Sequence, residues 1–588
     1  MPLLSGYPDL VGKKLGALPV ALDNSYAIIH SMSKKVLIGL SWPYANGRLH
    51  IGSIASSLPA DALARFHRMR GNDVAFVTGS DCYGTPILVA AKAEGITPAQ
   101  LSDKYHECHL RDFLSLGFTF DNYTKTTSTH HNEFVQNFHA EMYDGAGKSG
   151  DAAPIYAQAA NQLYCGKCEK YLPDRYVEGT CPHCEKEAKG DSCDHCGKML
   201  EPEELVSPRC KLCSATPVSR LTSQLYIRLS ALQQTLQDYY NDKKDAWANN
   251  AIGLTGRYLN EGLHDRAITR NIEWGIPLPH NAKKIFGFSD KEMSEKKIYI
   301  WAENVLGYPS ACKEFCDKTG RRWQDFLLNG TPTEKIHYYV HGKDNIPFHA
   351  LILPGLLLSN PRHDYHLPDM IVSSEYVKIA QDKISKSKGN LITAHEMVEK
   401  YPVDTIRYYF LKHVNDRKDT NFTIEEFTNT INADLVNGFG NLVNRTLSFI
   451  KTKLDGKTVP PPLDPVIEQK IQNTFDEAGA LIEAGRVNRA LAVITDLVNF
   501  GNKYFDTAAP WRTIKTDADV CVTSLFGVTT IIANLARLLY PFIPNACDKL
   551  ATMLHIQPNT WQVHTFINKI EINEIEILFK PLLDYKAV

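Results

Sequence analysis

The stretch that decides the fold reads Val36-Leu37-Ile38-Gly39-Leu40, then Ser41-Trp42-Pro43-Tyr44-Ala45-Asn46-Gly47 and, after two residues, His50-Ile51-Gly52-Ser53. Its first five residues form a short apolar run of the buried-strand type, which Pro43, Asn46 and Gly47 break into a loop. Periodic apolar residues resume from Ile51 through Phe66 and predict a helix. Strand, loop and helix in this order form the unit from which nucleotide-binding parallel sheets are built.

The rest of the chain divides around this unit. A second strand-and-helix region lies at Ile336 to Val340 and Ile352 to Leu358, and a segment holding eight of the fourteen cysteines stands between the two regions. The cysteine segment is therefore expected to be inserted into the sheet. From Ala433 onward strand signals fade and helical spacing takes over, which predicts a C-terminal helical bundle.

Size and charge set the class of protein. The chain has 588 residues, and 64 lysines and arginines stand against 66 aspartates and glutamates, so any nucleic-acid contact must come from local basic surface. We find no apolar run that predicts a membrane span and no secretion signal in the first 31 residues. The sequence predicts a multidomain cytoplasmic protein without a membrane partner.

The cysteines give the least ambiguous local signal. Four Cys-x-x-Cys pairs follow one another: Cys165 with Cys168, Cys181 with Cys184, Cys193 with Cys196, and Cys210 with Cys213. Two such pairs complete a closed tetrahedral zinc site, and eight ligands suffice for two ions. A disulfide framework is the alternative, which a cytosolic chain disfavours. Spacing leaves sequential, crossed and nested pairings of the four motifs open.

Two further motifs suit phosphate chemistry. His50, Gly52 and Ser53 lie where a helix begins, and a helix N-terminus offers free N–H groups and a partial positive charge to a phosphate. Far downstream, the loop Lys383-Ile384-Ser385-Lys386-Ser387 can neutralise triphosphate oxygens with its lysines. Taken singly, the histidine is as well explained by packing and the loop by a solvated charged turn.

The C-terminal region carries one polar pattern. Asn437, Asn441 and Arg445 fall at i, i+4 and i+8 on one predicted helix face, and Trp511 follows a turn at Ala509-Pro510. Aromatic stacking with amide and guanidinium hydrogen bonds is how proteins grip unpaired RNA bases. A solvated face explains the three polar residues equally well.

Together these motifs resemble the class I aminoacyl-tRNA synthetases, and the sequence between them is similar to the methionyl-tRNA synthetase family. The likeness runs from Lys35 to about Leu550, with landmarks at residues 42–47, 79–86, 172–179 and 342–349. The resemblance implies a Rossmann-type α/β catalytic domain, an inserted connective domain with zinc knuckles, and an all-α anticodon-binding bundle. Its zinc sites would be nested, with Cys181, Cys184, Cys193 and Cys196 holding the inner ion and the other four cysteines the outer one.

The resemblance also implies roles for individual residues. Catalysis would use His50, Gly52, Ser53, Lys383 and Lys386, and ATP would contact His50, Gly52, Asp344 and Lys386. Methionine would be bound by Ser41, Trp42, Tyr44, Asp81, Arg270, Trp301, Tyr308 and His349. The anticodon would be read by Asn437, Asn441, Arg445 and Trp511. Ser53, Ala302 and Asn304 depart from the family pattern.

The implied partners are ATP with Mg²⁺, L-methionine, tRNA(Met) and Zn²⁺ in one site, with the second site also available, in a monomer. The expected division is an extension at 1–33, catalytic halves at 34–150 and 261–372, the insertion at 151–260, a stem-contact region at 373–425, the bundle at 426–556 and a tail at 557–588. Two alternatives stay open at this point. One is a paralogue with altered amino-acid or inhibitor specificity, and the other is a catalytically impaired tRNA-binding protein.

Overall fold

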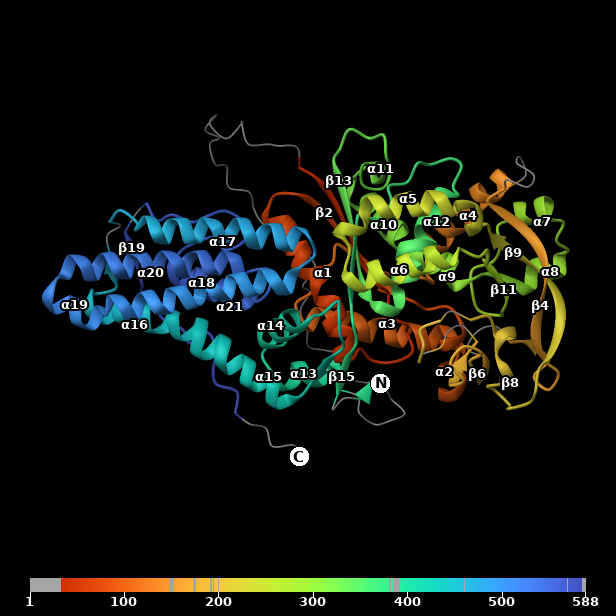
Figure 1. Ribbon diagram of the computed structural model, residues 1–588, viewed down its shortest axis with the longest axis horizontal. Helices are drawn as coiled ribbons and strands as arrows, with labels where there is room; N and C mark the ends of the chain where they lie inside the picture. The colour runs from red at the N-terminus through yellow and green to blue at the C-terminus, as the bar shows by residue number, and fades with distance from the viewer. Residues whose placement is uncertain are drawn as a thin grey trace, which may run out of the picture.

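The computed structural model describes residues 33–146, 153–172, 176–190, 193, 195–198, 200–379, 382–383, 392–458, 461–567 and 569–583. Residues 1–32 of the expected extension lie outside the described residues. Lys386 also lies outside them. Figure 1 shows three parts along the long axis: a helical bundle at one end, a sheet with covering helices in the middle, and long strands at the other end.

The middle part is built on a parallel sheet with the order β14-β13-β1-β2-β3. The strands are β1 (Lys35–Leu40), β2 (Asp73–Ser80), β3 (Asn122–Lys125), β13 (Lys335–Gly342) and β14 (Met370–Ser374). In the register of the central strands, Ile38 lies opposite Tyr338 on one side and Phe76 on the other. Both faces of β1 are buried, which is why its sequence is a continuous apolar run.

Helices cover both faces of this sheet. They are α1 (Ile51–Met69), α2 (Thr85–Glu94), α3 (Pro98–Ser115), α4 (Thr129–Ala146), α10 (Gly307–Thr319) and α12 (Leu353–Leu358). The predicted strands at residues 36–40 and 336–340 and the helices that follow them are confirmed. Since β1 leads to β2 on one side and pairs with β13 on the other, the chain order reverses between β1 and β13. Open α/β sheets bind ligands at the carboxyl ends of strands beside such a reversal.

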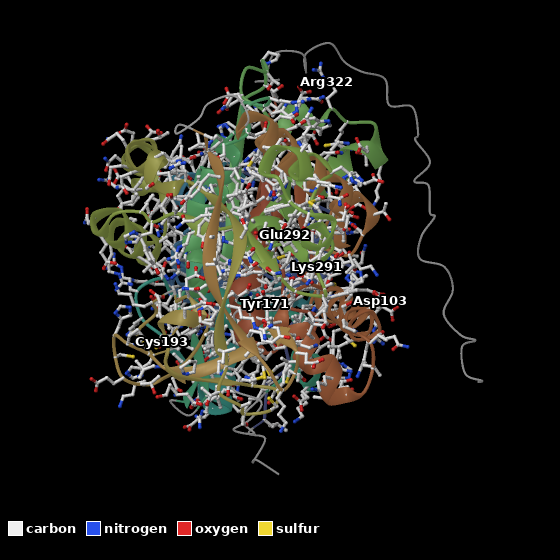
Figure 2. The ribbon with its side chains drawn as sticks, turned by 90° about the vertical axis from the view of Figure 1, so that its right-hand side faces the viewer. Asp103, Tyr171, Cys193, Lys291, Glu292 and Arg322 are labelled. Atoms are coloured by element: carbon white, nitrogen blue, oxygen red, sulfur yellow. The ribbon has the colours of Figure 1, made fainter. Side chains whose placement is uncertain are left out.

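The cysteine segment is inserted between β3 and β13, as predicted. Its long antiparallel ribbon consists of β4 (Ile155–Cys165) and β9 (Val218–Ile227), at the right of Figure 1. A small sheet of β6 (Val177–Thr180), β7 (Glu187–Lys189) and β8 (Val206–Cys210) lies at its tip. Figure 2 looks onto this end of the molecule, where Cys193 marks the cysteine-rich tip and Tyr171 marks the short strand β5 (Lys170–Tyr171), which pairs with β4.

The C-terminal part is a helical bundle, at the left of Figure 1. Its helices are α16 (Asn441–Lys453), α17 (Pro465–Glu483), α18 (Val487–Ala508), α19 (Pro510–Thr516), α20 (Ala518–Leu539) and α21 (Pro544–Leu554). Among the described residues, α20 alone is long and apolar enough to cross a membrane, but 72% of its most apolar window is buried inside the bundle. Its apolar surface is that of a central bundle helix.

A buried arginine joins the catalytic part to the bundle. Arg407 of α14 (Val403–His413) is fully buried and donates to Asp61 Oδ2 of α1 at 2.7 Å. The same guanidinium donates to the carbonyls of Phe542 and Pro541 at the start of α21, at 3.0 and 3.1 Å. A guanidinium has donors for several acceptors at once, so one side chain fixes these elements relative to each other.

Candidate active site

The segment that follows the lysine loop in the sequence lies against the N-terminus of α1. The backbone N–H of Ile51 donates to the carbonyl of Ile392 at 3.1 Å, and that of Ala394 donates to Leu49 at 2.9 Å. The loop that begins at Lys383, in β16 (Asp382–Lys383), therefore ends against His50. Ile384 to Leu391 lie outside the described residues, so the structure fixes where the lysine loop starts and ends.

His50 is the N-cap residue of α1. Its Nδ1 accepts a hydrogen bond from the backbone N–H of Gly52 at 3.1 Å. A neutral imidazole whose Nδ1 accepts must carry its proton on Nε2, so His50 presents an N–H donor on its other side. Gly52 and Ser53 occupy the first turn, where N–H groups and the helix dipole favour an anion.

Beside this helix start, a small cavity of about 60 Å³ lies at the carboxyl ends of three strands. Seven of the eight predicted methionine-binding residues line it: Ser41, Trp42, Tyr44, Asp81, Trp301, Tyr308 and His349. Ser41 directly follows β1 and Asp81 directly follows β2, where a parallel sheet presents polar groups to a ligand. Asp81 is 3% exposed, and its backbone N–H donates to the carbonyl of Pro43 at 2.9 Å.

A tyrosine and a histidine form the inner wall of the cavity. The Tyr308 hydroxyl and His349 Nε2 are 2.6 Å apart, and His349 Nδ1 is 2.8 Å from the carbonyl of Asn345. Since a carbonyl only accepts, Nδ1 carries the proton and the Tyr308 hydroxyl donates to Nε2. Burial lowers the pKa of His349 to about 4, so this wall is uncharged at neutral pH.

Two glycines allow the aromatic walls to approach the backbone. A Cβ on Gly39 would lie 2.7 Å from Cδ1 of Tyr308, and one on Gly307 would lie 2.9 Å from Cζ2 of Trp42. Either distance is too short for a carbon–carbon contact, so the rings hold their places only with glycine there. The run Val36 to Leu40 thus requires Gly39 because of the pocket.

The cavity has further lining residues that sequence reasoning did not assign to it: Ile300, Asn304, Val305, Asn345 and Phe348. Asn304 had been singled out as a departure from the family pattern, and the structure places it in the wall beside Trp301. Asn345 and Phe348 belong to the quoted segment at 342–349, four residues and one residue before His349. Helical spacing of four residues from His349 could have found Asn345, whereas Phe348, one residue away, carries no such signal.

Arg270, the eighth residue of the predicted set, is not among the residues that line this cavity, and its role toward the substrate stays a prediction. It lies in β11 (Thr269–Asn271), its guanidinium carbon sits 4.1 Å from the centre of the Tyr299 ring, and it donates to Glu201 at 2.9 Å. Glu201 belongs to the inserted segment, so Arg270 links the insertion to the catalytic part. It lines a separate cavity of about 430 Å³ between the two.

Asp344 lies at the carboxyl end of β13. It is part of a short 3-10 turn, Lys343–Asn345, directly after β13, and accepts a hydrogen bond from the Tyr376 hydroxyl. Its neighbour Lys343 forms ion pairs with Glu375 and Asp419 at 2.5 and 2.9 Å. Asp344 is thus held beside a charged cluster at the mouth of the sheet, where the sequence predicts ATP contacts.

The eight motif cysteines form two clusters with a nested pairing. Each cluster keeps its four sulfur atoms within 4.8 Å of one another: Cys181, Cys184, Cys193 and Cys196 in one, and Cys165, Cys168, Cys210 and Cys213 in the other. The Sγ separations of Cys184–Cys193 and Cys181–Cys196 are 3.5 and 3.9 Å. A tetrahedral ion with bonds of about 2.3 Å requires sulfur atoms about 3.8 Å apart, so either cluster could hold a zinc ion.

The backbone supports the same interpretation. The residue after the second cysteine of each motif has a positive φ, namely Glu169, Glu185, Gly197 and Ser214. At three of them the N–H closes a tight turn onto the first cysteine, for example Glu185 onto Cys181 at 3.0 Å. Turns of this kind point both thiols of a motif to one side, which a shared metal ion requires. The distances far exceed the 2.05 Å of a disulfide, so the disulfide alternative is wrong.

Two of the predicted anticodon residues, Arg445 and Trp511, lie around Phe505 in the bundle, and Asn441 begins the helix that carries Arg445. The Arg445 guanidinium lies 4.3 Å from the centre of the Phe505 ring, and the half-exposed Trp511 ring lies 6.1 Å from Phe505 on another side. Asn437 belongs to a π-helical stretch, Asn432–Gly440, that precedes α16. The α-helical spacing assumed for Asn437 and Asn441 is therefore wrong, although both side chains are exposed.

Comparisons with known proteins agree with this arrangement. Residues 36–447 match the family model described as tRNA synthetases class I (M), and residues 459–575 match the anticodon binding domain of methionyl tRNA ligase. A methionine–tRNA ligase from Bacillus mycoides is 41% identical over 94% of this chain and 97% of its own length. Methionine–tRNA ligase 1 from Alkaliphilus oremlandii is 39% identical over 93% and 97%.

Solved structures share the fold. The methionyl-tRNA synthetase of Mycobacterium tuberculosis in complex with methionyl-adenylate superimposes with a TM-score of 0.74 at 22% identity, covering 93% of this chain and 99% of that one. The sheet with its strand-end cavity, the cysteine insertion, the helical bundle and the match over most of the chain lead to one conclusion. The chain belongs to the methionine–tRNA ligase family of class I tRNA synthetases.

Proposed function

We propose that this protein activates L-methionine with ATP and transfers it to tRNA(Met) for translation initiation and elongation. The observation that carries the proposal is the strand-end cavity with seven predicted residues beside the start of α1. Attack of the methionine carboxylate on the α-phosphate of ATP gives methionyl-adenylate and pyrophosphate, and the terminal adenosine of the tRNA then receives the methionyl group. Positioning and charge stabilisation supply the rate enhancement.

Methionine fits the chemistry of the cavity. The buried Asp81 carboxylate suits the substrate ammonium, and Trp42, Trp301 and Tyr308 offer ring contacts to a polarizable thioether. Each contact between sulfur and an aromatic ring contributes only about 0.3–1.5 kcal/mol, so several rings are needed. Ser41 and Tyr44 complete the entrance, and the uncharged Tyr308–His349 pair suits an uncharged side chain.

ATP would lie along the start of α1. The start of α1, with its helix dipole and the first-turn N–H of Ser53, would face the phosphate oxygens, and His50, which caps this helix through Nδ1, would add its Nε2–H as a donor. Lys383 and Lys386 would neutralise the pyrophosphate as it leaves, Asp344 would contact the nucleotide, and Mg²⁺ would accompany the triphosphate. The hydrogen bond from Ile51 to Ile392 supports this arrangement, since Ile392, the first described residue after the lysine loop, lies at the start of α1.

The two cysteine clusters would each bind one Zn²⁺. Four thiolates close the coordination sphere, so these ions would hold the knuckles together and take no part in the reaction. Few buried apolar residues surround the two cysteine clusters. Because so small a core contributes little to folding, metal binding would supply part of the folding free energy of the knuckles.

The tRNA would contact both ends of the molecule. The anticodon would be read through hydrogen bonds and stacking by Asn437, Asn441, Arg445 and Trp511. Two observations support this: the Trp511 side chain is exposed, and both Trp511 and Arg445 lie beside the Phe505 ring. The working unit would be a monomer. A role in translation supports a cytoplasmic location.

The test is aminoacylation with purified protein. We expect methionine to be attached to a tRNA(Met) transcript and expect the same transcript with a non-methionine anticodon to be charged at least about 100-fold less efficiently. Stacking and base hydrogen bonds of about 1–3 kcal/mol each give a factor of this size when two or more are lost. Charging that ignores the anticodon would contradict the assignment of the bundle, and no charging at all would contradict the function.

A further inference from the structure

One histidine lies behind the proposed methionine pocket and contacts two of its walls. His131, in α4, places its Nε2 2.9 Å from Glu303 Oε2, and its ring centre lies 5.9 Å from that of Trp42. Trp42 forms one wall of the cavity, and Glu303 stands between the wall residues Trp301 and Asn304 in sequence. His131 and Glu303 are 0% and 1% exposed and do not line the cavity themselves.

Helix geometry separates Glu303 from its neighbours. Residues 300–303 form the short helix α9, and Trp301 and Asn304 are three positions apart, so their side chains share the face that lines the cavity. Glu303 is directed to the opposite side, where α4 lies. A second histidine of α4, His139, donates from Nε2 to the carbonyl of Ala302 at 2.9 Å. The pocket wall is thus attached from behind at two successive residues.

The hydrogen bond between His131 and Glu303 is one between neutral groups. Burial raises the pKa of the Glu303 carboxyl well above its ordinary value and lowers the pKa of His131 to about 3. The protonated Glu303 carboxyl therefore donates a hydrogen bond to His131 Nε2. A neutral pair avoids the desolvation cost of two buried charges and keeps a directional bond.

The surroundings of this contact are unusual for a protein core. Among the described residues, three buried polar atoms near it lack a hydrogen-bond partner: Trp42 Nε1, His131 Nδ1 and Glu303 Oε1. Buried polar atoms are nearly always paired, because an unpaired one keeps the cost of leaving water without compensation. Proteins retain such costs mainly at functional sites, where a position matters more than stability.

We propose that His131 and Glu303 are positioning residues that fix the spacing between the Trp42 wall and the Trp301 wall, and so determine which side chain the pocket accepts. The inference rests on the proposed function of the cavity. His131 contacts the Trp42 ring and forms a hydrogen bond with Glu303. Because Glu303 is followed directly by Asn304 and separated from Trp301 by one residue, this bond restrains the backbone that carries both wall residues.

The expected consequence concerns selectivity. An apolar pocket distinguishes side chains that differ by one methylene by about 10–200-fold, and only if its walls keep their distance. Loosening the walls should therefore raise the KM for methionine and reduce the preference for methionine over ethionine, which is longer by one methylene. The KM for ATP should not change, because neither residue approaches the start of α1.

Two substitutions of similar volume provide the test. Glu303→Gln keeps an N–H donor for His131 Nε2, whereas Glu303→Leu removes it. In methionine-dependent ATP–pyrophosphate exchange by the full chain, we expect E303Q to stay within about twofold of the wild type. We expect E303L to raise the KM for methionine about tenfold and to lower the preference over ethionine about tenfold.

His131→Phe tests the other partner, because it keeps a ring against Trp42 and loses the hydrogen bond. A matched control is His337→Phe, at a histidine of β13 that is also buried and donates only to the carbonyl of Phe326. H131F should behave as E303L, and H337F should lose thermal stability without a change in either KM. Should H131F not fold, the E303Q and E303L pair still gives the answer.

Three results would overturn the inference. They are unchanged selectivity in E303L and H131F, an equal rise in the KM for ATP and for methionine, or a loss of preference for methionine in E303Q as large as that in E303L. A wild-type protein without methionine-dependent exchange would instead overturn the proposed function, while exchange with altered selectivity only in the variants supports both.

Discussion

His50 Nδ1 accepts a hydrogen bond from the backbone N–H of Gly52 at 3.1 Å, within the first turn of α1. This bond caps the helix and at the same time fixes the tautomer, so that Nε2 carries the proton of the neutral ring. The proposed catalytic role and the helix cap thus fall on one residue, and the two can be separated by substitution.

His50→Ala should lower the kcat of methionine activation about 100–1,000-fold, the size of effect that follows the loss of one donor to developing charge. His50→Asn should keep the helix cap, because the asparagine oxygen can accept from Gly52 N–H. Methionine-dependent ATP–pyrophosphate exchange measures the role in the reaction, and thermal unfolding measures the role as a helix cap. His395→Ala, at an exposed histidine on the nearby helix Ala394–Lys400, is the control. An H50A variant with wild-type kcat would remove His50 from the reaction.

Zinc content tests the nested clusters. We expect two zinc ions per chain by mass spectrometry, and one ion after the double substitution Cys184→Ser and Cys193→Ser, since both belong to one cluster. Pairing Cys184→Ser with Cys168→Ser should instead affect both ions, because those residues belong to different clusters. Cys108→Ser, at a buried cysteine outside both clusters, should keep two ions. Equal zinc content in the two double variants would contradict the nested pairing.

Trp511→Ala should reduce kcat/KM for tRNA charging about 5–150-fold, as expected for the loss of about 1–3 kcal/mol of stacking. Methionine-dependent pyrophosphate exchange should not change, because the tryptophan lies at the far end of the bundle. Val466→Ala, at another exposed apolar residue of the bundle, serves as the control. Equal losses in charging and exchange would count against the anticodon role.

Stability should fall as the pH drops from 6.5 to 5. Burial lowers the pKa of His67, His131 and His337 to about 3 and that of His106, His139, His349 and His564 to about 4. In this range the unfolded chain binds protons that the native state does not, so the free energy of unfolding decreases with falling pH. Glu303, whose pKa burial raises, acts in the opposite direction as a single group.

Urea unfolding at pH 5.0 and pH 7.0 measures this difference, and His337→Phe should make the decrease smaller by the contribution of one histidine. A free energy of unfolding that is equal at both pH values, or larger at pH 5.0, would show that the buried histidines do not govern acid stability.

Local sequence was enough to predict the parts of the fold that depend on short-range pattern. The run Val36 to Leu40 is a central strand because it is buried on both faces, and the helix from Ile51 begins at a capping residue. The Cys-x-x-Cys spacing predicted clusters but left their pairing open. That pairing depends on how β4, β6 and β8 fold together, which the resemblance supplied and the sulfur distances then confirmed.

Other features depend on tertiary contacts that sequence pattern does not carry. The resemblance places Arg270 at the substrate, whereas in the structure it contacts the Tyr299 ring and Glu201 of the inserted segment. The π-helical stretch before Asn441 changes the face on which Asn437 lies. The contact of His131 with Glu303 spans 172 positions and carries no local signal. The expected domain boundaries and the lysine loop remain predictions.

ATP–pyrophosphate exchange by the purified full chain, measured with each of the twenty amino acids in turn, tests the central claim most directly. We predict exchange with methionine at least about 100-fold above exchange with any amino acid of different shape, which a cavity with several fixed aromatic walls can supply. Exchange that is fastest with another amino acid, or that does not occur with methionine, would contradict the claim that the strand-end cavity selects and activates methionine.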